Sequence, residues 1–159
     1  MQSFPNNLIR HKSRVRRISL SGNNFVVLRR GDLESLSRVQ LLVLDESNIG
    51  DVEEDAFGRM DRLERLHLNA NRLARVPASL PSASLTCLYL RANAIGVIGA
   101  DDLANLDRLQ QLDLSANVIE LIEMAAFDQL VRFVSSFVLD ISFRRVKSRN
   151  GSNGGGEGK

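Results

Sequence analysis

Between residues 65 and 91 the sequence holds several side chains that could take part in catalysis or recognition. They are Arg65, His67, Cys87, Tyr89 and Arg91. Catalysis would need the thiol of Cys87 as a nucleophile within hydrogen-bond reach of His67 as its base. Recognition would need only that the arginines and the aromatic rings share one exposed face, because tyrosine and arginine are enriched where protein interfaces bind most strongly. The strands expected to carry these residues set the distances between them, and these distances decide between catalysis and recognition.

These residues belong to a spacing that recurs along the chain. Leu63, Leu66, Leu68, Asn71 and Leu73 fit the pattern LxxLxLxxNxL, and we number the places of each copy from its first apolar residue. Further copies begin at residues 15, 39, 85 and 109, so the steps are 24, 24, 22 and 24 residues. Five copies in one frame predict a solenoid in which each coil stacks on its neighbours.

The spacing within a copy predicts a short strand. Side chains at places four and six point inward together, and those at places three, five and seven point outward. Stacked coils would align these strands in one parallel sheet. A polar residue at place nine suits the sharp turn after the strand, where it can satisfy main-chain groups of its own and the neighbouring coil. Stacked one on another, the place-nine residues are expected to form a ladder of hydrogen bonds, which we call the asparagine ladder. Its predicted members are Asn23, Ser47, Asn71, Asn93 and Asn117.

The 24-residue phrase resembles the typical leucine-rich repeat of animal extracellular proteins, including Toll-like receptors, Slit-like guidance proteins and small leucine-rich proteoglycans. The run RLARVPASLPSASLTCLYLRANAI resembles the short repeats of the proteoglycans. The resemblance implies an α/β solenoid, a leucine-rich-repeat horseshoe with a concave parallel β-sheet and a convex side of irregular segments, 3₁₀ turns and short helices. Members of this class usually carry a signal peptide and cysteine-rich caps. Because neither is seen here, we expect the chain to be a fragment of a longer protein.

The predicted organisation follows from the frame. Residues 1–14 are expected to form a partial repeat, because MQSFPNNL aligns with LARVPASL at residues 73–80. A degenerate sixth repeat is expected at 133–143, with Phe137 and Leu139 at places four and six, and a disordered, basic, glycine-rich tail at 144–159. The five full repeats predicted within 15–132 are 15–38, 39–62, 63–84, 85–108 and 109–132.

The return path of each coil carries its own signals. Acidic residues such as Asp32 and Asp101 precede the convex apolar anchors and suit the start of a short helix or a 3₁₀ turn. Pro77 and Pro81 disfavour a helix in the 22-residue copy and predict an extended return there.

Charge distribution argues against nucleic acid as a partner. The net charge is +2, but residues 18–143 carry 18 acidic and 11 basic residues, so the predicted repeat body is acidic and only the ends are basic. The basic ends lack the interleaved aromatic residues that stack on bases. No apolar run is long enough for direct membrane insertion: the apolar stretch at 131–143 is short and contains Arg132 and Asp140.

Stacked strands bring equal places side by side, about 4.8 Å apart. Place five then forms the row Ser19, Val43, His67, Tyr89 and Asp113. We expect the concave face to bind a partner through Arg65, His67, Tyr89, Arg91, Asp113 and Asp45. The alternative is a sheet face that is merely solvated.

The same spacing argues against an enzyme. His67 and Asp113 would lie two strands apart, roughly 10 Å, with Tyr89 between them. Cys87 would lie diagonal to His67 and has no second cysteine for a disulfide. One cysteine and two histidines, His11 and His67, do not suggest a zinc site, and no phosphate-binding loop is present. We expect no cofactor.

The sequence therefore predicts a non-catalytic protein-binding module, part of an extracellular or cell-surface receptor or matrix protein. Its expected partner is a protein ligand or a receptor ectodomain, and a homodimer is also compatible with the sequence. The alternative is an intracellular, cytoplasmic repeat scaffold or adaptor, favoured by the missing signal peptide and the unpaired Cys87.

Overall fold

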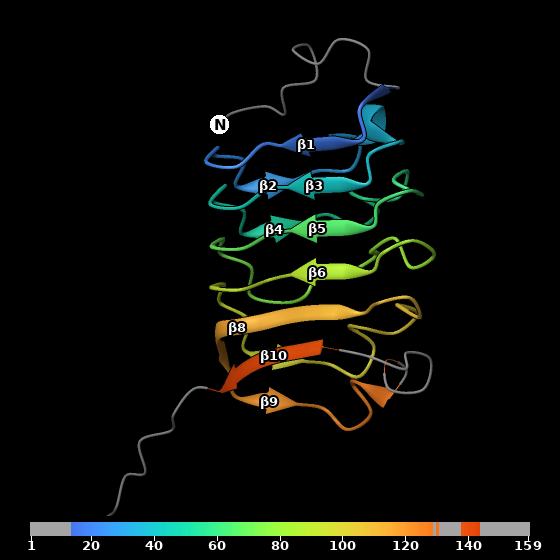
Figure 1. The fold of residues 1–159 in the computed structure, drawn as a ribbon. Helices are drawn as coiled ribbons and strands as arrows, with labels where there is room; N and C mark the ends of the chain where they lie inside the picture. Colours follow the sequence, from blue (N-terminus) through green and yellow to red (C-terminus); the bar gives the residue numbers. More distant parts are fainter. Residues whose placement is uncertain (1–13, 129, 131–137, 144–159) are drawn as a thin grey trace, which may run out of the picture.

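The chain winds into stacked coils, and each coil adds one strand to a shared sheet. The computed structural model describes residues 14–128, 130 and 138–143. Figure 1 shows these strands one below another, from β1 to β10. The elements are β1 (Arg17–Ser19), β2 (Val27–Leu28), the 3₁₀ helix η2 (Glu34–Leu36), β3 (Leu41–Val43), β4 (Asp51–Val52), β5 (Arg65–His67), β6 (Cys87–Tyr89), β7 (Val97–Ile98), β8 (Gln111–Ile119), β9 (Leu121–Ile122) and β10 (Val138–Phe143).

The main sheet confirms the repeat frame and the predicted solenoid. Its six strands follow the order β1-β3-β5-β6-β8-β10, and all neighbouring pairs run parallel. Residues of equal place lie opposite each other, as Leu42, Leu66 and Leu88 do at place four. Two small parallel sheets, β2-β4 and β7-β9, form on the path that leaves the main strands.

The core consists of apolar rows, with one residue from each coil in each row. At place four, Leu42, Leu66, Leu88 and Leu112 are at most 1% exposed. Alternate residues of a strand point to the same side, so place six joins them. Phe57 closes the core from the convex side and is 1% exposed. No coil encloses such a core alone, so burial depends on stacking.

The place-nine asparagine links two coils through their main chains. Asn71 Nδ2 donates to the carbonyl of Leu44 on the preceding coil at 2.9 Å and to that of Leu68 on its own coil at 3.0 Å. Its Oδ1 accepts from the N–H groups of Ser47 at 3.1 Å and Ile49 at 2.9 Å. One amide thus pairs four main-chain groups at the buried turn. The other place-nine side chains that donate to main-chain carbonyls are Asn23, Ser47, Asn93 and Asn117.

The turn that aims this side chain inward uses a left-handed residue at place eight. Its φ lies between 52° and 71° in all five coils. Only Gly22 adopts this conformation without a steric cost, and a side chain there costs about 1–2 kcal/mol. The other four residues are Glu46, Ala70, Ala92 and Ala116.

On the return path, the carboxylates mostly accept main-chain hydrogen bonds rather than start helices. Asp32 accepts from the N–H of Arg29 at 2.8 Å, and Glu53 of the next coil accepts from that of Arg30 at 3.0 Å. Between the fourth and fifth coils the same roles are taken by Asp102 and Glu123. The expected helical start is seen at η2. In the 22-residue copy, residues 68–86 hold no helix or strand, in agreement with its prolines.

β10 adds a sixth strand, but in a different frame from the predicted one. Leu139 lies opposite Leu112 and Ile141 opposite Leu114, so they occupy places four and six. The prediction that Leu139 holds place six is therefore wrong by two residues. Leu139 and Ile141 alternate with other residues, and a shift of two residues keeps both side chains on the same face of the strand. The predicted place of Phe137 lies outside the described residues. The apolar pattern alone could not choose between these frames.

The sixth coil departs from the others after its strand begins. The pairing of β10 with β8 shifts register between Ile141 and Phe143. The hydroxyl of Ser142 accepts from the N–H of Ala116 at 2.7 Å, where the earlier coils use a main-chain carbonyl. Leu139 is 38% exposed, against 1% for Leu112 in the coil before it. The core is thus less completely covered at β10.

Two predicted segments lie outside the described residues: the partial repeat at 1–14, apart from Arg14, and the tail at 144–159. The repeat boundaries as a whole stay predictions. In the part of the chain that the structure describes, no helix has the length and apolar character needed to cross a membrane.

Truncating a core leucine tests the stacking. Leu66 is fully buried, so Leu66→Ala should lower the free energy of unfolding by about 2–5 kcal/mol, as should Leu112→Ala. The matched control is Leu121→Ala, because Leu121 is 52% exposed and should cost less than about 1 kcal/mol. Urea denaturation measures all three, and an equal loss at Leu66 and Leu121 would contradict the buried row.

Removing the amide of Asn71 tests the ladder. Asn71→Ala leaves three buried main-chain groups unpaired, the carbonyl of Leu44 and the N–H groups of Ser47 and Ile49, whereas the carbonyl of Leu68 keeps its hydrogen bond from Asn93. Because each unpaired group costs about 1–3 kcal/mol, we expect a loss above about 3 kcal/mol in urea denaturation. Asn69→Ala is the control two residues away, where the half-exposed site admits water and the loss should be less than half as large. Similar losses for the two variants would contradict the view that the buried amide of Asn71 stabilises the stack more than the half-exposed amide of Asn69.

Candidate functional site

The concave face of the main sheet carries places three, five and seven. The register sets His67 on β5 opposite Tyr89 on β6, and Tyr89 opposite Asp113 on β8. Arg65 stands at place three of β5, and Arg91 follows β6 at place seven. We call Arg65, His67, Tyr89 and Arg91 the concave cluster. That it binds a partner stays a prediction.

Two aromatic rings form the middle of the concave cluster. The ring centroids of His67 and Tyr89 are 4.3 Å apart and the ring planes are tilted by 35°. The hydroxyl of Tyr89 donates a hydrogen bond to Oε1 of Gln111 at 2.6 Å. Both ends of the tyrosine side chain are therefore held in place, and the two half-buried rings form a firm surface.

The two arginines flank these rings and are exposed. No ion pair or hydrogen bond from either guanidinium group is formed within residues 14–128, 130 and 138–143. The main chain at Arg91 is nevertheless fixed, because its N–H donates to Oδ1 of Asn69 at 2.9 Å. Both positive groups therefore remain available to a ligand.

The two predicted carboxylates are already engaged by the fold. Asp45 Oδ1 accepts the main-chain N–H of Asn69 at 2.7 Å. Asp113 Oδ1 accepts both the N–H and the hydroxyl of Ser115, at 2.9 and 2.6 Å. Asp45 and Asn69 thus form a second ladder, at place seven, from one coil to the next. The two carboxylates lie at the margins of the concave cluster.

Burial and charge shift the titration of both rings. Burial lowers the pKa of His67 below its usual 6.5; Asp45 acts in the opposite direction, and Arg65 lowers the pKa further. His67 is therefore neutral at pH 7, so its ring can stack without a charge. Burial also raises the pKa of Tyr89, with the Cys87 side chain the next cause. Tyr89 is thus a hydrogen-bond donor at neutral pH.

The arrangement does not assemble a nucleophile with a base. Cys87 is a half-buried free thiol whose Sγ lies 3.7 Å from Oγ1 of Thr86, and the register puts it beside Arg65. The strand of Tyr89 separates His67 from Asp113. A search of the described residues finds no group of three His, Cys, Asp or Glu residues that could hold a metal ion.

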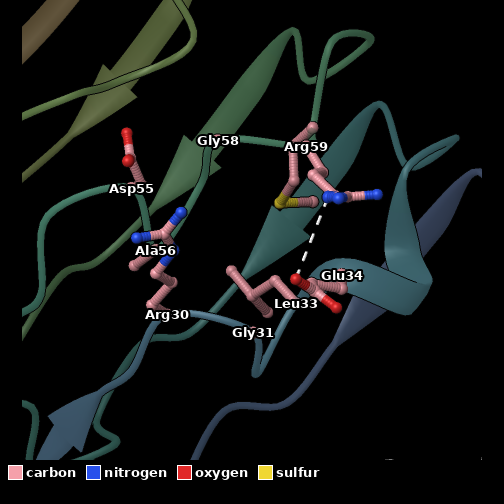
Figure 2. Close-up of a pocket in the computed structure, with 9 residues that line it drawn as sticks. Arg30, Gly31, Leu33, Glu34, Asp55, Ala56, Gly58 and Arg59 are labelled. Atoms are coloured by element: carbon pink, nitrogen blue, oxygen red, sulfur yellow. Dashed lines mark ion pairs between the residues drawn. The ribbon is translucent and has the colours of Figure 1, made fainter.

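Three hollows along the described residues lie on the return side, away from the concave cluster. Figure 2 shows one of about 230 Å³ between the first two coils, where Arg59 Nε lies 3.8 Å from Glu34 Oε1 and the buried Leu33 lines the hollow. Both charges are well exposed, so this ion pair contributes little. Two larger hollows, of about 470 and 500 Å³, lie on either side of Pro77. They reflect the shortened return of the 22-residue copy.

The prediction of the site omitted two residues that organise it. Gln111 anchors the Tyr89 hydroxyl, and Asn69 holds the main chain of Arg91. Gln111 occupies an outward place on β8, and Asn69 occupies an outward place in the turn that follows β5. Gln111 is a diagonal neighbour of Tyr89, and Asn69 stands between Asp45 and Arg91 in the row of place seven, so listing the row and diagonal neighbours of each predicted residue would have found both.

Comparisons with known proteins agree with the repeat frame. A family model described as Leucine rich repeat matches residues 13–73 and 83–135. Podocan of Mus musculus is 34% identical over 80 residues, which are 49% of this chain and 13% of Podocan.

Solved structures share the fold at low sequence identity. A complex of Latrophilin 3, Unc5D and the LRR of FLRT2 contains a chain that matches 80% of this one at 24% identity and a TM-score of 0.73. A chain of the LRIM1/APL1C complex matches 78% of this chain at 24% identity and a TM-score of 0.68. A chain of the TLR13–ssRNA13 complex matches 81% of this chain at 23% identity and a TM-score of 0.69. Because these identities are low, the likeness shows the fold alone. The chain spans only 39%, 24% and 18% of the three matched chains.

The titration of His67 tests the electrostatics of the concave cluster. We expect an NMR midpoint below 6.5, lowered further by Asp45→Asn and raised by Arg65→Gln. Because the unfolded chain binds this proton more readily, the His67 contribution to the free energy of unfolding is full above pH 6.5 and is lost as pH falls through the folded pKa. His67→Gln should remove that part of the pH dependence. A midpoint at or above 6.5 would contradict the burial of the ring.

Proposed function

Because the chain belongs to the leucine-rich-repeat family, we propose that it is a non-catalytic module that binds a protein partner through the concave sheet. The fold supports a protein-interaction role, and proteins of this family are in general binding modules rather than catalysts. The convex side is occupied by turns that hold the coils together, whereas the concave side presents two guanidinium groups, of Arg65 and Arg91, that make no ion pair or hydrogen bond with the residues that the structure describes.

The guanidinium groups beside the stacked rings, which have no partner among the described residues, carry this proposal. The leucine rows and the asparagine ladder account for stability, yet neither needs Arg65 or Arg91 at an outward place. Arginine and tyrosine provide large contact area and directed hydrogen bonds, which is why they dominate interface energetics. Their assembly at the middle of the sheet favours recognition over a merely solvated face.

The proposed partner is a protein ligand or a receptor ectodomain, and the proposed setting is a longer extracellular or cell-surface protein. The resemblance to repeats of animal extracellular proteins supports the setting, and the likeness to Podocan agrees with it. Two of the matched structures are named as protein complexes, which supports the class of partner. The third is named as a complex with single-stranded RNA, but the excess of acidic residues in 18–143 disfavours RNA here.

An intracellular scaffold is the second candidate, and the free thiol of Cys87 favours it, because thiols persist unpaired most readily in reducing compartments. Antibody staining of intact against permeabilised cells separates the two settings. Both candidates use the same concave face, so the binding test below applies to either.

Replacing Tyr89 and Arg91 by alanine should weaken partner binding at least tenfold, because each hot-spot side chain is worth about 1–2 kcal/mol. Biolayer interferometry first identifies partners of the unmodified chain in a panel of purified ectodomains. The affinity of the double variant is then measured for each partner found. The control is the double variant Arg62→Ala, Arg75→Ala, whose exposed side chains lie outside the main sheet. Circular dichroism melts verify folding. Partners that bind the Tyr89/Arg91 variant normally would exclude the concave face.

A further inference from the structure

The two arginines of the concave cluster are spaced along the strands rather than across them. Arg65 is at place three of β5, and Arg91 lies four places further along on the neighbouring coil, opposite Asn69. With a rise of about 3.3 Å per residue and strands about 4.8 Å apart, their Cα atoms are about 14 Å apart. The His67–Tyr89 ring stack lies between them, at place five of the two strands. Positive, aromatic and positive groups therefore follow one another along a short diagonal.

We propose, resting on the function proposed above, that the concave cluster recognises an extended acidic segment of a partner protein. Its carboxylates at positions i and i+4 pair with Arg65 and Arg91, and an apolar or aromatic side chain at i+2 lies on the His67–Tyr89 stack. An extended peptide turns the side chains of i, i+2 and i+4 to one face, and four residues span about 13 Å. This repeat distance matches the spacing of the two guanidinium groups.

Charge at the margins sets the direction of the segment. A chain that crosses the strands on either side meets Asp45 beyond β3, and Asp113 and Asp140 on β8 and β10. A long polyanion such as RNA or a sulfated glycan has to span several coils and would approach these carboxylates. A short segment that runs along β5 and β6 puts its two carboxylates at Arg65 and Arg91, whose neighbours on the adjacent coils carry no charge, and turns only its apolar side chain toward the row that holds Asp113. The face thus selects two separated carboxylates over a uniform line of charge.

The concave cluster is held in place before any ligand arrives. The hydrogen bond from Tyr89 to Gln111 fixes the ring, and Asn69 fixes the main chain of Arg91. Because Asp45 bonds to the main chain of Asn69, the same ladder joins three successive coils. Binding then requires ordering of little more than the arginine side chains, which lowers its entropic cost.

The test uses the whole chain labelled with ¹⁵N and titrated to millimolar peptide. The probe GSESLSESG has glutamates at i and i+4 with leucine between them, and GSEELSSSG has the same composition with adjacent glutamates. We expect the first peptide to shift the amides of Arg65, His67, Tyr89 and Arg91 and to bind about fivefold more tightly than the second. Arg65→Gln and Arg91→Gln should each weaken it by a similar factor, and Arg75→Gln, which alters an exposed residue outside the sheet, should not.

Several outcomes would overturn the inference. These are no shift of the concave amides at millimolar peptide, equal binding of the two peptides, equal binding of the lysine peptide GSKSLSKSG, or tighter binding of a thirteen-nucleotide single-stranded RNA at the same amides. The proposed function fails separately. If the peptides fail but protein partners are still lost in the Tyr89/Arg91 variant, the concave face binds proteins of another chemistry; if those partners are retained, the face itself is excluded.

Discussion

After each strand of the main sheet the chain turns sharply, and the turn carries main-chain N–H and C=O groups into the core. Left unpaired there, each would cost free energy comparable to that of a lost hydrogen bond. Asn71 meets this demand for two coils at once, by donating to Leu44 and Leu68 and accepting from Ser47 and Ile49. Because such an asparagine also pairs main-chain groups of the neighbouring coil, each coil depends on the next for its stability.

This dependence explains where the stack is regular and where it is not. The 22-residue copy keeps its strand and its ladder residue, so the sheet passes through it unchanged while the return path shortens. Its deficit appears on the convex side, as hollows on either side of Pro77. In the sixth coil the structure describes the strand, and there the register shifts and Leu139 is partly exposed. The strand and its turn are therefore the essential part of a coil.

A sheet built in this way fixes the spacing of its outward side chains. Places three, five and seven repeat at the distances of the strand rise and of the strand separation, whatever residues occupy them. In the third and fourth coils they hold Arg65, His67, Tyr89 and Arg91, whose main chains cannot shift without breaking the stack. The recognition that we propose would thus use outward positions that the core does not constrain, which is why the fold alone does not name the partner.

The sequence by itself determined the frame of the first five coils, the inward rows and the concave rows. Its leucines and asparagines recur at a period that only one stacking satisfies, so Leu66 falls opposite Leu88 without any structure. The tertiary structure decided the register of the last strand and the partners of the outward side chains, which the sequence pattern leaves open. An alternation of period two allows the β10 segment two frames, and contact with β8 chose the one with Leu139 at place four. The structure likewise shows that Tyr89 donates to Gln111 and that Asp45 accepts from the main chain of Asn69. The repeat period does not encode these partners, because they depend on distances between side chains of different coils.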